Sequence, residues 1–195
     1  KGRKISKSLG NNIDPVDVIE QYGADAVRMA MIMGTSVGSD SKVSADKFKA
    51  YKHFANKIWN VSRFILMNLG DYDPDYKIDW STENRCTEQR KFLYNFREFC
   101  KEIDKEMTSF HFYLGAEKLY HYFWHIFADS IVEKSKEELR SPNSDVRQKT
   151  QHMLVEILTT SLKLLHPFMP FITEEIYSKL PLKEKKMLLV EDWPA

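Results

Sequence analysis

The feature that most restricts the fold of this chain is a helical repeat of apolar residues, which recurs in four long segments. Between about residues 45 and 69, apolar side chains return every three or four positions. Segments at about 83–108, 112–139 and 146–165 have the same period. Because such a stripe covers one side of a helix, long helices of this kind bury their stripes against one another. The sequence therefore predicts an all-α fold, a helical bundle.

The buried stripes of the first two long segments are expected to contain many aromatic residues. In the first segment they are Phe48, Tyr51, Ala55, Ile58, Trp59, Ser62, Ile65 and Leu69, and in the second they are Phe92, Phe96, Phe99, Ile103 and Met107.

A smaller loop-and-helix segment precedes the bundle. Asp14 is the expected cap of a helix that begins at Pro15, and Gly23 separates this helix from a second one over about 24–33. The stretch 34–46, "GTSVGSDSKVSAD", has the Gly and Ser content of a linker. We therefore divide the chain into residues 1–42, the loop-and-helix segment, and residues 43–195, the bundle. Within the bundle, Ser44 caps the first long helix, a short helix is expected over about 170–179, and an extended tail, "KKMLLVEDWP", follows it.

Composition excludes several classes of protein. The chain has 195 residues, of which 43% are hydrophobic and 13% aromatic, enough for a large core. It has no apolar run long enough for a membrane span and no apolar stretch after its basic start that would indicate a secretory signal. Cys86 and Cys100 both fall in a helical pattern, which favours free thiols in a reducing compartment. We expect a cytoplasmic protein.

Charge is unevenly distributed along the chain. Residues 1–70 hold 11 Lys and Arg against 6 Asp and Glu, although the net charge of the whole chain is only +1. The N-terminal third is therefore the part that would face an anionic partner.

Two common types of site do not fit the sequence. The spacing of a phosphate-binding P-loop fails because Lys7 stands where the second glycine is needed. His121, His125 and Asp129 share a helical face, but their surroundings are strongly aromatic and the zinc-protease pattern is absent. We predict packing histidines and no metal site.

A lysine-rich loop near the N-terminus is the first candidate binding site. Lys4 and Lys7 offer mobile ammonium groups, and Ser6 and Ser8 offer hydroxyl donors. Lysine suits the charge that grows on phosphate oxygens during a reaction. The alternative is a basic chain end with no ligand.

The second candidate is a polar and basic face on the first long helix, which amide and guanidinium groups equip for contact with a nucleic-acid backbone. The alternative is an ordinary solvated face. The residues of this face are Lys52, Asn56, Lys57, Asn60 and Arg63.

Four stretches of the sequence carry a resemblance to a known family. "KISKSLGN" followed by "DPVDVIEQYGADAVRMA" resembles the KMSKS signature and adjoining stem-contact helices of class I aminoacyl-tRNA synthetases, with Ile5 in place of Met. "HFANKIWNVSRFIL" is similar to the start of the anticodon-binding domain in the valyl members of that family. "LLHPFMPFITEEIY" is similar to a late signature of the same domain. The bundle is thus expected to be of the class I anticodon-binding type.

The resemblance implies a function for the whole family member. It would activate valine with ATP and Mg²⁺ and ligate it to tRNA(Val). Lys7 would stabilise the pyrophosphate leaving group, Lys4 would help to hold the phosphates, and Ser6 and Ser8 would shape the loop. The nucleotide-binding fold of the family would lie ahead of Lys1, so we expect a fragment that is monomeric and inactive alone.

Two alternatives remain open from the sequence. The amino acid is isoleucine or leucine in one of them, within the same family. In the other, the chain is a helical scaffold that binds proteins and has no catalytic role.

Overall fold

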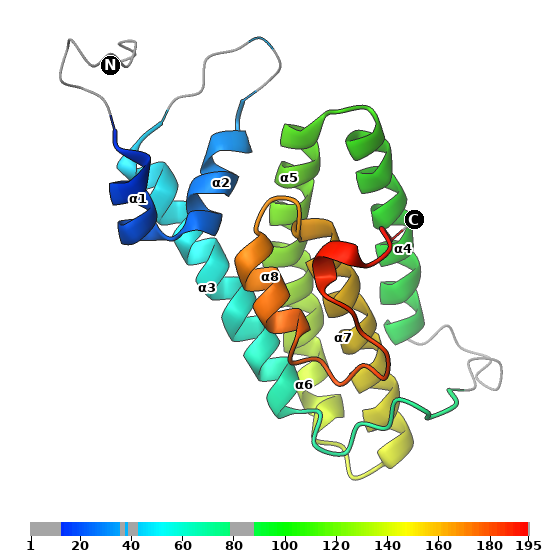
Figure 1. Cartoon of the computed structure of the whole chain (residues 1–195). Helices are drawn as coiled ribbons and strands as arrows, with labels where there is room; N and C mark the ends of the chain where they lie inside the picture. Colours follow the sequence, from blue (N-terminus) through cyan, green and yellow to red (C-terminus); the bar gives the residue numbers. More distant parts are fainter. Residues whose placement is uncertain (1–12, 36–37, 39–42, 79–87, 195) are drawn as a thin grey trace, which may run out of the picture.

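The computed structural model describes residues 13–35, 38, 43–78 and 88–194. Throughout these residues the chain forms helices, turns and loops with no β-strand, which confirms the predicted all-α class (Figure 1). The pair α1 (Pro15–Tyr22) and α2 (Ala24–Ile32) comes first. The bundle that follows contains α3 (Ala45–Met67), α4 (Glu88–Thr108), α5 (Phe112–His121), the π-helix η2 (Tyr122–Val132), α6 (Glu133–Leu139), α7 (Ser144–Leu165), α8 (Pro170–Tyr177) and the 3-10 turn η3 (Leu188–Val190).

Local capping sets where several of these helices begin. The side chain of Asp14 accepts a hydrogen bond from the backbone N–H of Val16, and that of Ser44 accepts one from Lys47, so both predicted caps are confirmed. Asn143 caps α7, which begins two residues earlier than predicted. The predicted residues 83–87 lie outside the part of the chain that the structure describes.

The core of the bundle is apolar and rich in aromatic rings. Phe54, Ile58 and Ile65 of α3 are fully buried. The Phe54 ring lies 4.7 Å from that of Tyr120 and stacks on Trp124 at 6.2 Å, centroid to centroid. These contacts hold α3 against α5 and η2. Ile58 and Ile65 were predicted to be buried, whereas Phe54 was not among the residues predicted for the stripe.

Trp59 does not belong to this core, although the repeat places it there. Its side chain is 37% exposed. Because each residue turns an α-helix by about 100°, the position directly after buried Ile58 points away from the same neighbour.

The predicted helix over 112–139 is continuous, but its middle eleven residues form a π-helix, η2. Single π turns are the usual form of this structure, and they cluster at functional sites. An apolar repeat does not distinguish a π turn from an α turn over so short a distance, so the sequence did not indicate it.

The tail is fastened to the bundle rather than simply extended. Lys163 on α7 pairs with Glu191 at 3.1 Å, and the indole N–H of Trp193 donates to Asp104 on α4 at 3.0 Å. The tail also forms η3, which was not predicted.

Cys100 is a buried free thiol, and burial raises its pKa to about 11. Cys86 falls outside the described residues.

The pair α1 and α2 lies at the N-terminal end of α3 (Figure 1). Val18, Ala30 and Phe48 form a small apolar cluster between this pair and α3, separate from the main core. Within the described part of the chain, no helix combines the length and the apolar character that a membrane span needs.

Candidate nucleic-acid interface

The predicted polar face of α3 is exposed at four of its five residues, and Lys57 is half-buried. Asn56, Asn60 and Arg63 are all exposed, at i, i+4 and i+7 of a helix whose opposite side is buried in the core. Arg63 has no ion-pair partner among the described residues. The structure therefore brings two amides and one guanidinium together on an open surface, where each retains its hydrogen-bonding capacity.

The two lysines of the predicted set are engaged within the protein. The ammonium group of Lys52 donates to the backbone carbonyl of Gln21 on α1 at 2.8 Å. Lys57 lies 2.6 Å from the Asp129 carboxylate and 5.5 Å from the ring centroid of Trp124. Lys52 thus ties α1 to α3, and Lys57 ties α3 to η2.

Asp129 lies in a cluster of titratable groups on η2. His125 Nδ1 is 3.7 Å from its carboxylate, and the rings of His125 and His121 lie 5.1 Å apart, centroid to centroid. Across the described residues, no three His, Cys, Asp or Glu side chains are arranged so that they could hold a metal ion.

One further residue, Trp59, borders the polar face and was not among the predicted binding residues. Trp59 and Arg63 line a small cavity of about 100 Å³, whose other side is formed by Ile176 of α8 and by Lys179, two residues after this helix. Lys136 lies 5.6 Å from the ring centroid of Phe64 and pairs with Glu133. In the sequence, the only sign that Trp59 is exposed is its position one residue after Ile58.

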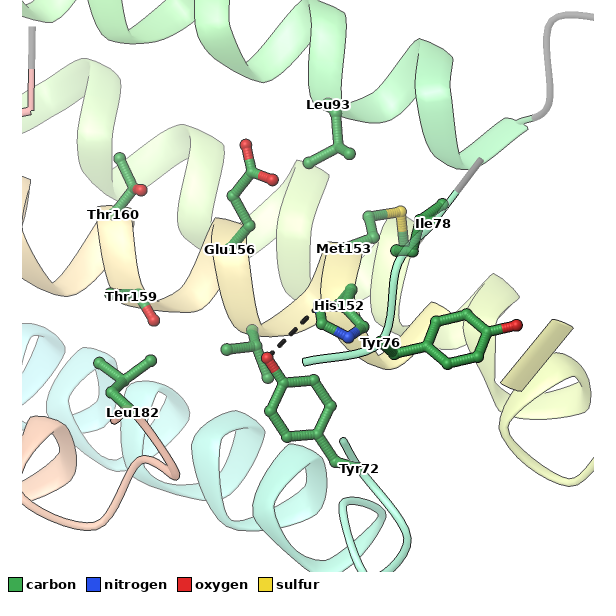
Figure 2. Close-up of a pocket in the computed structure, with 11 residues that line it drawn as sticks. Tyr72, Tyr76, Ile78, Leu93, His152, Met153, Glu156, Thr159, Thr160 and Leu182 are labelled. Atoms are coloured by element: carbon green, nitrogen blue, oxygen red, sulfur yellow. Dashed lines mark hydrogen bonds between the residues drawn. The ribbon is translucent and has the colours of Figure 1, made fainter. Parts of the chain in front are cut away.

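A larger pocket lies elsewhere, where the connection after α3 crosses α7 (Figure 2). It has a volume of about 450 Å³. Figure 2 shows Tyr72 pointing at His152, whose Nδ1 lies 3.4 Å from the tyrosine hydroxyl. His152 Nε2 lies 2.9 Å from the carbonyl of Asp73, and the Tyr76 hydroxyl donates to Asp145 at 2.6 Å.

The polar groups of this pocket are thus mostly bonded to the protein itself. Gln148 adds to the same seam, because its amide accepts from the backbone N–H of Asp73 and donates to the carbonyl of Asp71. Thr159 Oγ1, which also lines the pocket, is buried without a hydrogen-bond partner. The bonds made by Tyr72, Tyr76, His152 and Gln148 nevertheless make this region a structural seam between the connection and α7.

The lysine-rich loop cannot be placed by the structure. Lys4, Ser6, Lys7 and Ser8 all lie outside the described residues.

Comparison with known families identifies both parts of the chain. The model described as "tRNA synthetases class I (I, L, M and V)" matches residues 1–44, and that described as "Anticodon-binding domain of tRNA ligase" matches residues 89–195.

Curated relatives align with nearly the whole chain. The Valine--tRNA ligase of Thermotoga maritima is 42% identical over 99% of the chain, and that of Enterococcus faecalis is 42% identical over 100%. The chain spans only 21% and 22% of the length of these relatives, respectively.

Solved structures of synthetases share the fold. The leucyl enzyme of Agrobacterium radiobacter K84, LeuRS in a ternary complex with tRNA and LeuAMS, aligns with a TM-score of 0.73 at 21% identity, over 99% of this chain and 22% of that one. The Mycobacterium tuberculosis methionyl-tRNA synthetase with methionyl-adenylate aligns with a TM-score of 0.70 at 19% identity, over 90% of this chain and 35% of that one.

The family that the "KISKS" and "HPFMPF" stretches indicated is therefore confirmed. The helical architecture, the match of more than half of the chain to the anticodon-binding model and the match of its first residues to the class I model agree. This chain belongs to the class I tRNA ligases and comprises their anticodon-binding helical domain with the segment that precedes it.

Proposed function

We propose that the protein carrying this sequence is a valine–tRNA ligase, and that this part of it binds tRNA(Val) and supplies the lysine-rich loop of the ATP site. The observation that carries the proposal is the identity of about 40% to enzymes named Valine--tRNA ligase, which extends over 99% of the chain. A cytoplasmic location and a monomeric state belong to the same proposal.

The proposed division of the chain is 1–42 for the end of the catalytic domain and 43–195 for the bundle. The limits of the two family matches, residues 1–44 and 89–195, support it.

In the first step of the proposed reaction, a carboxylate oxygen of valine bonds to the α-phosphorus of ATP. The bond from that phosphorus to the bridging oxygen breaks, and pyrophosphate leaves with the electron pair. Lys7, assisted by Lys4, would stabilise the charge that grows on the leaving group. Mg²⁺ would arrive bound to the ATP phosphates, where it neutralises charge, and no described residue is assigned as its ligand.

In the second step, tRNA must be held so that its acceptor end receives the aminoacyl group. We assign the primary contacts to Asn56, Asn60 and Arg63, because these side chains are exposed and uncommitted. The guanidinium of Arg63 suits a phosphate, and the amides suit sugar or base edges. Lys52 and Lys57 would contribute through their positive field, since both ammonium groups already have partners.

The lysine loop is tested by Lys7→Ala in the natural protein. We expect the rate of valine-dependent ATP–pyrophosphate exchange to fall at least about tenfold, which corresponds to about 1.4 kcal/mol of transition-state stabilisation. Lys49→Ala removes an equal charge from an exposed position on α3. It should leave the rate of ATP–pyrophosphate exchange unchanged, because this reaction is measured without tRNA. An unaltered rate in Lys7→Ala would refute the assigned role.

The RNA-binding face is tested by the salt dependence of tRNA binding to the 195-residue chain. Arg63→Ala should weaken binding and lower the slope of log K against log salt by about one. Arg97→Ala is the control for the loss of one positive charge, because α4 lies on the far side of the bundle from α3 (Figure 1). Unlike Arg63, Arg97 pairs with Glu156 at 2.8 Å. Equal slopes for both variants would remove Arg63 from the interface.

The choice of amino acid is tested by charging assays on the natural protein with valine, isoleucine and leucine. Selective charging with valine is expected. Selective charging with one of the others would replace the proposal by the corresponding ligase. Failure to charge any of them, together with no retention of tRNA at low salt, would favour the scaffold alternative.

A further inference from the structure

α8 begins at a carboxylate that comes from the other end of the sequence. Asp25 on α2 is only 7% exposed. Its Oδ2 accepts a hydrogen bond from the backbone N–H of Ile172 at 2.7 Å, and its Oδ1 accepts one from Phe171 at 3.2 Å. Since Pro170 is the first residue of α8, these are N–H groups that the helix itself leaves without partners. Asp25 therefore caps a helix 146 residues away along the chain.

A second contact lies one helical turn further along α2. The guanidinium of Arg28 donates to the backbone carbonyl of Pro167 at 2.9 Å. Residues 25 and 28 share a face of α2, so the two side chains hold the entry to α8 from both sides. Asp25 accepts hydrogen bonds and Arg28 donates one. The two contacts therefore fix the direction in which α2 meets the start of α8 as well as its position.

The remainder of α8 reaches the proposed RNA-binding face. Ile176 and Lys179 line the cavity that Trp59 and Arg63 border on α3. α8 thus contacts α2 at its start and α3 near its end, and it also packs on α7. α8 therefore connects α2 with the surface around Arg63.

We infer that Asp25 is a positioning residue, which through α8 sets the orientation of α2, part of the proposed end of the catalytic domain, relative to the RNA-binding face of the bundle. The inference rests on the proposed function. Arg28 supports the same joint, the contact between α2 and the start of α8, through its hydrogen bond to the Pro167 carbonyl. Misplacement of part of a catalytic domain by about 1 Å, even far from the reacting atoms, lowers the rate of the chemical step.

The packing of α2 indicates that the joint sets geometry more than it holds the fold together. Met29 and Met33 insert into the main core with 0% and 7% exposure, and Ala30 packs in the small cluster on α3. These apolar contacts remain when the Asp25 carboxylate is removed. Asp25→Ala should therefore fold, and Asp25→Asn keeps one oxygen that can accept from Ile172.

A distance measurement tests the joint without reference to activity. Nitroxide labels are placed at Met31→Cys on α2 and Glu175→Cys on α8, both exposed, in a background that carries Cys86→Ser and Cys100→Ala. We expect the distribution of distances between the labels to broaden in Asp25→Ala and to broaden less in Asp25→Asn. Asp17→Ala, which removes an exposed carboxylate from α1, is the control and should match the parent. An Asp25→Ala distribution that superimposes on the parent overturns the inference.

A kinetic measurement on the natural protein tests the effect on chemistry. The rate of ATP–pyrophosphate exchange per titrated active site should fall at least about fivefold in Asp25→Ala, with the KM for the amino acid within about twofold of the parent. Asp25→Asn should recover part of the rate. A purely structural role would reduce the number of active sites and the Tm but leave the rate per site unchanged, and that result would also overturn the inference.

Failure of the proposed function has a different signature. In that case the parent protein itself shows no exchange with valine, isoleucine or leucine, and the label distances alone decide whether Asp25 is the joint.

Discussion

The helix pair α1–α2 and the bundle differ in how they are held. Phe54 and Phe123 in the bundle are at most 1% exposed, among aromatic neighbours on several helices. By contrast, Val16 and Ile19 on α1 are 61% and 41% exposed, and Ile13 just before this helix is 41% exposed. The bundle is stabilised by its own interior, whereas α1 buries little of its apolar surface and the pair is anchored to the bundle through buried side chains of α2, such as Met29.

At the junction, polar contacts add direction to the apolar packing of α2. Lys52 on the Gln21 carbonyl and Asp25 on the start of α8 connect the two regions through directed hydrogen bonds. Hydrogen bonds specify an orientation, which non-directional apolar burial does not do. The two regions are therefore joined in a manner suited to geometric control.

The largest effect is expected from the interior of the bundle. Phe54→Ala should lower the free energy of unfolding by about 3–5 kcal/mol, because it removes a fully buried ring and leaves a cavity. Ile19→Ala on α1 should change it by less than about 0.5 kcal/mol. Urea unfolding of the 195-residue chain measures both. Similar losses for the two variants would break the comparison between the regions.

A smaller effect is expected from the seam between α7 and the connection after α3. Gln148→Leu should cost about 1–3 kcal/mol, because it leaves the Asp71 carbonyl and the Asp73 N–H without their partner. Gln21→Leu, an exposed change on α1, is the matched control and should be nearly neutral. If Gln148→Leu also proves neutral in urea unfolding, the seam contributes nothing to the difference between the regions.

The attachment of the tail should depend on pH only in acid. The backbone N–H of Lys186 and the ammonium of Lys163 lower the pKa of Glu191 to about 2. A carboxyl whose pKa is lower in the folded state stabilises that state above its unfolded value near 4.5, and this contribution is lost as the pH falls towards 2. Carboxyl ¹³C NMR should give a midpoint near 2, and Glu191→Gln should flatten the fall in stability over this range. A midpoint near 4.5 would contradict the docked tail.

The smallest effect is expected at the surface of α3. A double-mutant cycle on Lys57 and Asp129 should give a coupling energy of only about 0.2–1 kcal/mol, because their side chains are 29% and 46% exposed. Thermal unfolding of the two single variants and the double variant measures it. A coupling energy well above this range would mean that Asp129 holds Lys57 more strongly than the exposure of the two side chains implies, so that Lys57 is less available to RNA.

Much of the fold follows from patterns that are local in the sequence. Ser44 and Asp14 start their helices because each side chain bonds a backbone N–H two or three residues away. Ile58 and Ile65 are buried as their spacing predicts, but the fully buried Phe54 was not among the residues predicted for the stripe. The π-helix η2 was missed because an apolar repeat does not distinguish π turns from α turns. The exposure of Trp59 was missed because the repeat does not resolve which way neighbouring positions of the stripe point.

The sequence by itself determined that the chain is helical, which side of each long helix is apolar and which family it resembles. Only the tertiary structure decided that Lys52 and Lys57 are paired, that Arg63 is open and that Asp25 caps α8. The physical reason is that a helical repeat records which face must be covered but carries no information on which distant element covers it. A polar side chain acquires its partner only when segments far apart along the chain are packed together.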